Sequence, residues 1–385
     1  MKHLSDVLKW ACLVVLGTAL AASAQSTAPE TRPAVLQPVI SPQVYANGTV
    51  MFRLRAPTAG KVSVTIEAAG APMTMSRDKE GIWSVLAPPL LPDVYIYGFN
   101  VDGVRMLDPA NPDVQPRRSL ISSLFEIYAA TPQYYDFQNV PHGVVRVERY
   151  FSKSLGRIRS MRVYTPPGYD QDLSQRYPVL FLLHGYGDDD ATWTGAGRAP
   201  WIEDNLIAEK KAVPMVIVMP DCHAVVPPES GHTPAATLKN LLEFQGDLLG
   251  DVLPYIQGNY RVKEAAVDRA IIGPSMGGRQ GLTIGLTHLN LFGWVGGMSA
   301  SLPDPDATLA DESGEAAKTR RELQSLWFCC GTDDPLMVQN QQFDQLLTRD
   351  GIAHHFQSYP GGHGWPTWRP ALRDYLQIVF QPPDG

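Results

Sequence analysis

Cysteine is scarce in this sequence, and no cysteine or histidine has the spacing of a zinc site. Only four cysteines occur in 385 residues, and one of them lies in the N-terminal segment. The other three, Cys222, Cys329 and Cys330, would allow one disulfide, but buried, unpaired thiols fit the sequence at least as well. Cys329 and Cys330 are adjacent and would point to opposite faces of a strand, so they are poor partners for each other. We expect neither a metal ion nor a cofactor.

Positive charge is also in deficit. The chain has 32 lysines and arginines against 39 aspartates and glutamates, which gives a net charge of -7 and argues against nucleic acid as a partner. Its hydrophobic fraction of 44% is that of a globular protein with substantial cores, and its length allows two domains.

The apolar run at the N-terminus is too short for a membrane span. Two lysines precede an apolar run over residues 10–21, which is shorter than the roughly 20 residues that a spanning helix needs. The small residues Ala22, Ser23 and Ala24 follow. This pattern predicts a signal peptide over residues 1–24, cleaved before Gln25, and hence a secreted or periplasmic protein without a stable membrane anchor.

After a linker at residues 25–34, apolar residues alternate with polar ones. The runs read "TVMFRLRAP", "KVSVTIEAA", "GIWSVLAPP" and "DVYIYGFNVDG". Period-two runs rich in Val, Ile, Phe and Tyr, broken by Gly, Pro and Asn, predict a small antiparallel β-sandwich of immunoglobulin type over residues 35–130.

The same region resembles a known module through "FRLRAPTAGKVSVTI", "DKEGIWSV" and "YIYGFNVDGVRMLDPANP". It is similar to the immunoglobulin-like module that precedes the catalytic domains of glycogen-branching enzymes, carbohydrate-binding module family forty-eight. A glycan-binding face would need exposed aromatics such as Trp83, Tyr95 or Tyr97, whereas aromatics at strand spacing more often pack in the core or between domains. We expect the sandwich to support the catalytic domain or to bind polysaccharide weakly, without taking part in bond cleavage.

The pattern changes over residues 131–385, where short, apolar, β-rich runs are separated by segments with helical character. Examples are "PVLFLLHGYG", "MVIVMPD", "RAIIGPSMGG" and "SLWFCCGTDD". Nearly continuous apolar strands that alternate with helices predict a mostly parallel sheet covered on both faces, as in an α/β-hydrolase.

The run "AIIGPSMGGRQG" predicts a nucleophile at the end of one such strand. Gly273 and Gly277 flank Ser275 at two residues on either side, and small residues allow the tight strand-to-helix turn that exposes a serine. The backbone N–H of Met276, at the start of the helix, would then donate to an oxyanion. A second donor is expected from Tyr186 in "LLHGYG", where we expect the His184 ring to fix the loop.

Serine needs a base, and the base needs an acid. His363 lies in the glycine-rich loop "YPGGHGWP" after the last β-rich run, where it can reach across the end of the sheet. The preceding run ends in "GTDD", which offers Asp333 and Asp334 as the acid. Successive side chains of an extended segment point opposite ways, so only one of the two can face His363.

Taken in order, "YTPPGY", "LLHGYG", "GPSMGG", "GTDD" and "GGHGWPTWRPAL" resemble the esterases of carbohydrate esterase family one. This group includes feruloyl esterases, acetylxylan esterases, siderophore esterases and mycolyl transferases. The resemblance implies an α/β-hydrolase with Ser275, Asp334 and His363 as its triad. Pro274 departs from the leucine usual in the group and removes one N–H beside the nucleophile.

The tandem of sandwich and esterase domain resembles secreted feruloyl esterases, which implies hydrolysis of hydroxycinnamate esters on arabinoxylan, an ester-decorated plant polysaccharide. Trp193, Trp365 and Trp368 could stack on a phenolic acyl group or a sugar, although each alone is more often structural. The acidic run at residues 188–190 would repel an anionic substrate unless it is a solvated turn. Two insertions, at residues 221–237 and 301–322, could border the cleft.

Three alternatives stay open: an acetylxylan esterase, an enterochelin-type siderophore esterase, and a glycan-binding protein with a degenerate esterase domain. The complete triad argues against the last of these.

Overall fold

The computed structural model describes residues 38–67, 69–118, 122–225, 233–302 and 323–381. The predicted signal peptide and linker lie outside the described residues, as do residues 226–232 and 303–322 of the two insertions. The described residues from Val39 onward belong to one compact unit. Within the described part of the chain, no helix combines the length and the apolar character that crossing a bilayer would require.

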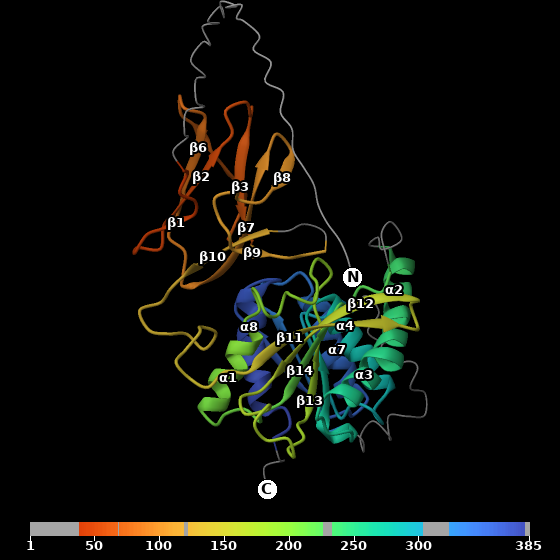
Figure 1. The fold of residues 1–385 in the computed structure, drawn as a ribbon. Helices are drawn as coiled ribbons and strands as arrows, with labels where there is room; N and C mark the ends of the chain where they lie inside the picture. The colour runs from red at the N-terminus through yellow and green to blue at the C-terminus, as the bar shows by residue number, and fades with distance from the viewer. Residues whose placement is uncertain (1–37, 68, 119–121, 226–232, 303–322, 382–385) are drawn as a thin grey trace, which may run out of the picture. The chain divides into compact units, whose positions relative to one another are not determined.

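The first part of the described chain consists of two antiparallel sheets (Figure 1). One sheet has the order β1 (Gln43–Val44), β2 (Val50–Arg55), β6 (Ile82–Ala87) and β5 (Ser76–Arg77). The other has the order β4 (Met73–Thr74), β3 (Val62–Ile66), β7 (Asp93–Val101), β10 (Ser122–Ile127) and β9 (Val114–Gln115), with β8 (Val104–Met106) paired to β7. Alternate residues of β2 and β3 are buried, as the period-two pattern predicts for strands with one core-facing side.

The aromatic residues considered for glycan binding lie inside this part of the molecule. Trp83, Tyr95 and Tyr97 are 7%, 9% and 0% exposed, and all three belong to one apolar cluster with Phe125. The Tyr97 hydroxyl donates to Asp108 at 2.7 Å. The packing alternative is therefore correct for these residues, because rings buried in an apolar cluster are withdrawn from solvent.

An eight-stranded sheet follows. Its order is β11 (Val144–Ser152), β12 (Arg157–Thr165), β14 (Val216–Pro220), β13 (Val179–Leu182), β15 (Arg269–Ile272), β16 (Trp294–Met298), β17 (Ser325–Gly331) and β18 (His355–Tyr359). The strands from β14 to β18 are parallel, whereas β11 and β12 form an antiparallel extension. This is the mostly parallel sheet that the apolar runs predict.

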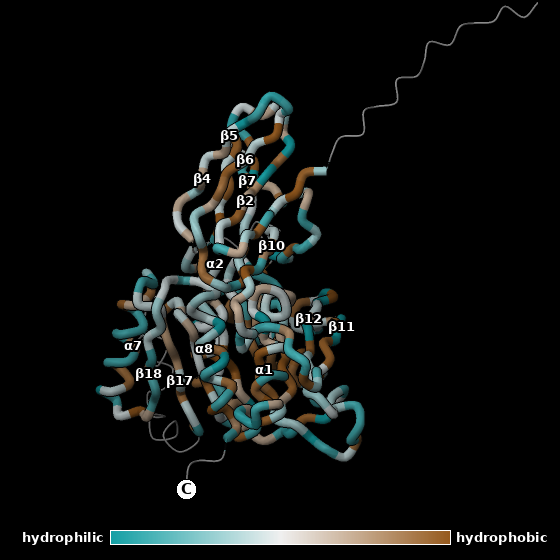
Figure 2. The backbone as a smooth tube through the Cα atoms, turned by 90° about the vertical axis from the view of Figure 1, so that its left-hand side faces the viewer, coloured by the Kyte–Doolittle hydropathy of each residue, from teal (hydrophilic) through white to brown (hydrophobic). Residues whose placement is uncertain are grey.

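Helices cover both faces of this sheet. They are α1 (Ala199–Ala208), α2 (Pro234–Asp247), α3 (Leu253–Asn259), α4 (Met276–Thr287), α7 (Met337–Arg349) and α8 (Trp365–Ile378), with a π-helical turn at Leu248–Val252 between α2 and α3 and a 3₁₀ turn at Ala266–Asp268. One apolar cluster joins the sheet to α2, α3, α4 and α7, and a second joins the other face to α1 and α8. In Figure 2, brown marks the hydrophobic residues along the chain, and many of them lie within these layers. Burial on both faces explains why β13 and β14 are apolar throughout and why β15 is apolar after its first residue, Arg269.

The turn between β15 and α4 is held in a strained conformation. Ser275 has φ 55° and ψ -114°, a backbone conformation that residues other than glycine seldom adopt. A Cβ on Gly273 would lie 2.7 Å from the Leu183 Cβ, and a Cβ on Gly277 would lie 2.7 Å from the His184 carbonyl oxygen. The glycines are therefore required because the helix starts directly against the end of β13.

We predict that Gly277→Ala costs about 1–3 kcal/mol of unfolding free energy and lowers turnover, because the methyl group must displace backbone at the turn. Gly258→Ala is the matched control, since Gly258 lies in α3 and, apart from its chain neighbours and the backbone of its own helix, no atom of the described residues comes within 4 Å of the position that its Cβ would take. The control should gain about 0.5–1 kcal/mol from helix propensity. Urea denaturation of both variants measures these changes, and equal stability of the two would contradict the account.

Candidate active site

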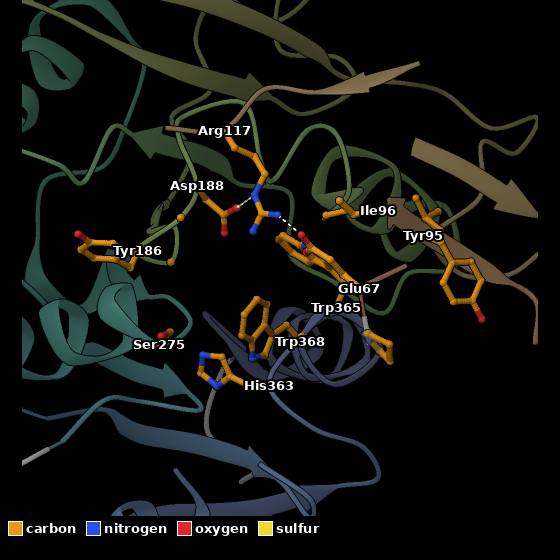
Figure 3. A pocket seen from close by; sticks show the side chains of 15 residues that line it. Glu67, Tyr95, Ile96, Arg117, Tyr186, Asp188, Ser275, His363, Trp365 and Trp368 are labelled. Atoms are coloured by element: carbon orange, nitrogen blue, oxygen red, sulfur yellow. Dashed lines mark hydrogen bonds and ion pairs between the residues drawn. The ribbon is translucent and has the colours of Figure 1, made fainter. Parts of the chain in front are cut away.

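The predicted catalytic residues meet at the carboxyl edge of the parallel strands. Ser275 lies between β15 and α4, Asp334 follows β17, His363 follows β18 and Tyr186 follows β13. Ligands bind at this edge in α/β sheets. A cavity of about 260 Å³ lies there, bordered by Ser275, Tyr186 and His363 among others (Figure 3).

The imidazole of His363 is oriented by a buried carboxylate. Its Nδ1 lies 2.9 Å from Oδ2 of Asp334, whose side chain is fully buried. The other carboxylate oxygen of Asp334 accepts the backbone N–H of Leu336 at 2.8 Å. An Nδ1–H that donates to Asp334 leaves Nε2 of the ring as the proton acceptor.

The environment of Asp334 favours its ionised form. Burial raises the pKa of this carboxyl, but the hydrogen bonds from His363 and from the backbone N–H of Leu336 outweigh burial, so its pKa lies below the usual value for aspartate. The neighbouring Asp333 is exposed. The structure thus places one aspartate of "GTDD" against His363 and the other in solvent. The segment is a turn and not the extended segment expected from the sequence, because the backbone N–H of Asp334 donates to the Gly331 carbonyl oxygen at 3.2 Å.

Two histidines of the esterase part contact the turn that carries Tyr186. His184 Nδ1 lies 2.7 Å from the Gly185 carbonyl oxygen, and its Nε2 accepts the backbone N–H of Cys222 at 2.8 Å. His223 Nε2 contacts the carbonyl oxygen of Tyr186. His184 thus holds the loop, as expected.

Burial lowers the pKa of His223 to about 3, so the His223 ring is neutral at physiological pH. A neutral His223 ring with its proton on Nε2 can donate a hydrogen bond to the carbonyl oxygen of Tyr186. Met276, the other residue expected to supply an oxyanion donor, is the first residue of α4.

The three tryptophans separate into two groups. Trp365 and Trp368 border the cavity, and the Trp368 ring packs edge-on against the His363 ring with centroids 5.1 Å apart. Trp193 does not border the cavity. Its indole is 1% exposed, donates to the Leu183 carbonyl oxygen at 2.7 Å and packs edge-on against Trp365. Trp193 thus supports the cavity wall from behind, and this placement speaks against direct contact with substrate.

The acidic run at residues 188–190 is neither a uniform repulsive surface nor a solvated turn. Asp188 borders the cavity and pairs with Arg117, whose Nε lies 3.1 Å from Oδ1. Asp189 accepts the backbone N–H of Ala191 at 3.0 Å and so stabilises the turn. Burial raises the pKa of the Asp190 carboxyl, and a hydrogen bond with the Ser160 side chain opposes this shift.

Sequence reasoning missed the residues that the N-terminal sheets contribute. Glu67, Tyr95, Ile96 and Arg117 border the cavity together with Ser275. Arg117 also forms an ion pair with Glu67. The sandwich therefore does more than support the sheet from a distance. No local pattern marks these residues, because their contact with the site arises only when the two parts of the chain pack together.

The cysteines lie apart from this chemistry. Cys222, Cys329 and Cys330 are buried and unpaired, in agreement with the second of the two alternatives for these residues. Burial raises the pKa of Cys330 to about 12 and also raises the pKa of Cys329 well above its usual value, so neither thiol ionises near neutral pH.

A serine on a strained strand-to-helix turn, beside an imidazole that a buried carboxylate orients, defines an α/β-hydrolase when it lies at the carboxyl edge of a mostly parallel sheet. The chain belongs to the family of putative esterases, whose pattern it matches over residues 152–377. It is a carboxylic-ester hydrolase similar to feruloyl esterases.

Three relatives show how far the similarity extends. An endo-1,4-beta-xylanase/feruloyl esterase of Xylanibacter ruminicola is 28% identical over 88% of this chain, which covers 46% of that protein. A ferulic acid esterase of the fungus Anaeromyces mucronatus superposes with a TM-score of 0.56 at 25% identity, over 65% of this chain and 96% of its own. The enterobactin esterase of Shigella flexneri has a TM-score of 0.63 over 86% of this chain and 94% of its own, but at 19% identity it shows the fold alone.

We predict that Asp334→Asn lowers turnover about a thousandfold or more, because an amide cannot stabilise the imidazolium and can favour the wrong tautomer of His363. Asp333→Asn is the adjacent control and should lose less than about tenfold. Turnover on one ester, with folding checked by circular dichroism, compares them. The reverse ranking would assign the acid to Asp333, and two mild effects would remove this loop from the triad.

Proposed function

We propose that this protein is a feruloyl esterase that releases hydroxycinnamate from plant cell-wall arabinoxylan through an acyl-enzyme on Ser275. The observation that carries the proposal is the aromatic wall beside the nucleophile. Trp365, Trp368 and Tyr186 border the cavity that Ser275 also borders (Figure 3). Aromatic rings offer offset or edge-on contacts to a phenolic acyl group, which an acetyl group could not use.

In the proposed mechanism, His363 Nε2 accepts the proton of the Ser275 hydroxyl as its oxygen attacks the ester carbonyl. Asp334 holds the ring and stabilises the imidazolium. The backbone N–H groups of Tyr186 and Met276 donate to the oxyanion of the tetrahedral intermediate. His363 then protonates the departing sugar alcohol. Water, activated by the same ring, releases the acid and restores the serine.

The charges at the cavity favour an uncharged acyl group. Glu67 and Asp188 contribute two carboxylates and Arg117 one guanidinium, and both carboxylates form ion pairs with Arg117. The surplus is negative, so it opposes strongly anionic acyl groups such as catecholate siderophores. A feruloyl group with a neutral phenol meets no such penalty.

The comparisons support the same substrate class. The Xylanibacter relative carries feruloyl esterase in its name, and the Anaeromyces enzyme has also been solved in complex with ferulic acid. The chain covers about half of the Xylanibacter protein. That protein's substrate is therefore only proposed for this chain. We further propose export through the predicted signal peptide, which would bring the enzyme to its polysaccharide outside the cytoplasm.

We predict that the protein hydrolyses methyl ferulate with a higher kcat/KM than p-nitrophenyl acetate or a triscatecholate siderophore, measured side by side. Ser275→Ala should abolish turnover on methyl ferulate and keep the fold, because it removes the nucleophile and leaves no large cavity. Hydrolysis by a folded Ser275→Ala variant would refute the acyl-enzyme. Preference for the acetyl ester or the siderophore would move the enzyme to one of the two alternative esterase classes.

A further inference from the structure

One segment of the N-terminal sandwich is fastened to the loops around the candidate active site. Gln115, at the end of β9, is fully buried and accepts the backbone N–H of Ala196 at 2.8 Å. Arg118 donates to the Val225 carbonyl oxygen at 2.7 Å. Residues 115–118 therefore bind the esterase part at more than one point, and Arg117 lies between these anchors.

Arg117 reaches the turn that carries Tyr186. Its Nε donates to Oδ1 of Asp188 at 3.1 Å, and the backbone N–H of Asp188 closes the turn by donating to the Gly185 carbonyl oxygen at 3.2 Å. The Asp188 side chain is only 5% exposed. Burial raises the pKa of the Asp188 carboxyl above its usual value, and the Arg117 guanidinium offsets part of this increase, so the charge on Asp188 depends on its pairing with Arg117.

The turn at residues 185–188 is thus held from two sides. His184 and His223 contact its carbonyl oxygens from within the esterase part. Arg117 holds its last residue from the sandwich. Figure 3 shows Arg117 between Asp188 and Glu67, on the same side of the cavity as the turn.

We propose that Arg117 is a positioning residue for the oxyanion site: by holding Asp188 it fixes the turn that aims the Tyr186 N–H at the developing oxyanion. The sandwich then completes the active site of the esterase domain. The inference rests on the proposed role of Tyr186 in ester hydrolysis. It also replaces the expectation that the sandwich takes no part in bond cleavage.

A direct role of Arg117 in binding an anionic substrate fits the geometry less well. The Arg117 side chain is 18% exposed, and its guanidinium contacts two carboxylates, Glu67 and Asp188. An anionic ligand would have to displace one of them in a site with surplus negative charge. A group paired in this way holds its neighbours in place, and its removal leaves a buried, unpaired carboxylate.

The test compares Arg117→Met, Arg117→Lys, Asp188→Asn and the double variant Arg117→Met/Asp188→Asn in the full chain. The substrate is p-nitrophenyl acetate, because its small acyl group separates oxyanion stabilisation from acyl recognition. We expect Arg117→Met to lower kcat about ten- to a hundredfold with KM changed less than about threefold, since displacement of a catalytic donor by a fraction of an ångström has this effect. Arg117→Lys should recover part of the loss. The double variant should be no slower than Arg117→Met.

Phenylboronic acid supplies a second readout that needs no turnover. It bonds to a catalytic serine and places an oxygen in the oxyanion site, so its Kd should weaken in Arg117→Met by a factor similar to the loss in kcat. Wild-type protein that binds the boronate but hydrolyses neither p-nitrophenyl acetate nor methyl ferulate would contradict the proposed function, while the Kd ratio would still decide the inference.

Arg198→Met is the matched control. Arg198 is also partly buried, at 16% exposure, and also joins the two parts of the chain, through an ion pair of 3.1 Å with Glu126. Its guanidinium stacks over the Trp201 ring, and neither Glu126 nor Trp201 belongs to the turn at residues 185–188. This variant should keep kcat within about twofold of wild type.

Three results would overturn the inference. The first is a folded Arg117→Met variant with wild-type kcat and boronate affinity. The second is an equal loss in Arg198→Met, which would indicate general loosening between the two parts. The third is a double variant whose loss is the product of the two single losses, because Arg117 would then act independently of Asp188. If Arg117→Met does not fold, the inference is tested on Arg117→Lys and Asp188→Asn instead. For these variants, kcat and the Kd of phenylboronic acid are compared with the wild-type values.

Discussion

The whole site depends on how closely α4 approaches the end of β13. The backbone at Gly273 and Gly277 lies so near Leu183 and His184 that a side chain would collide with them. This contact forces Ser275 into a positive φ and turns its hydroxyl toward the cavity. It also brings the first residue of α4 beside the turn after β13. The proposed nucleophile and both expected oxyanion donors are therefore positioned by a single packing contact.

The other two residues of the proposed triad are positioned by the same sheet. Parallel strands end at one edge, so the loops after β17 and β18 deliver Asp334 and His363 next to the elbow. The fold buries Asp334 completely and still satisfies it by hydrogen bonds, which keeps the carboxylate ionised. Burial and pairing thus supply orientation and charge together, without any need for the exposed Asp333.

Features that local patterns govern could be predicted from the sequence, whereas features that depend on long-range packing could not. Alternation predicts the strands of the sandwich, and glycine spacing predicts the elbow at Ser275, since both depend on residues a few positions apart. Trp193 and Trp365 look equivalent in sequence, yet the fold turns one inward behind the other. Arg117 lies 71 positions from Asp188, and nothing near it in sequence indicates that contact.

The central claim is that Ser275 carries the acyl group between two steps of ester hydrolysis. The most direct measurement is mass spectrometry of protein quenched in acid within milliseconds of mixing with a feruloyl ester, followed by mapping of the modified peptide. The account predicts one feruloyl group per chain, attached at Ser275 and lost as free ferulate accumulates. Steady release of ferulate with no covalent adduct, or an adduct on a residue other than Ser275, would contradict it.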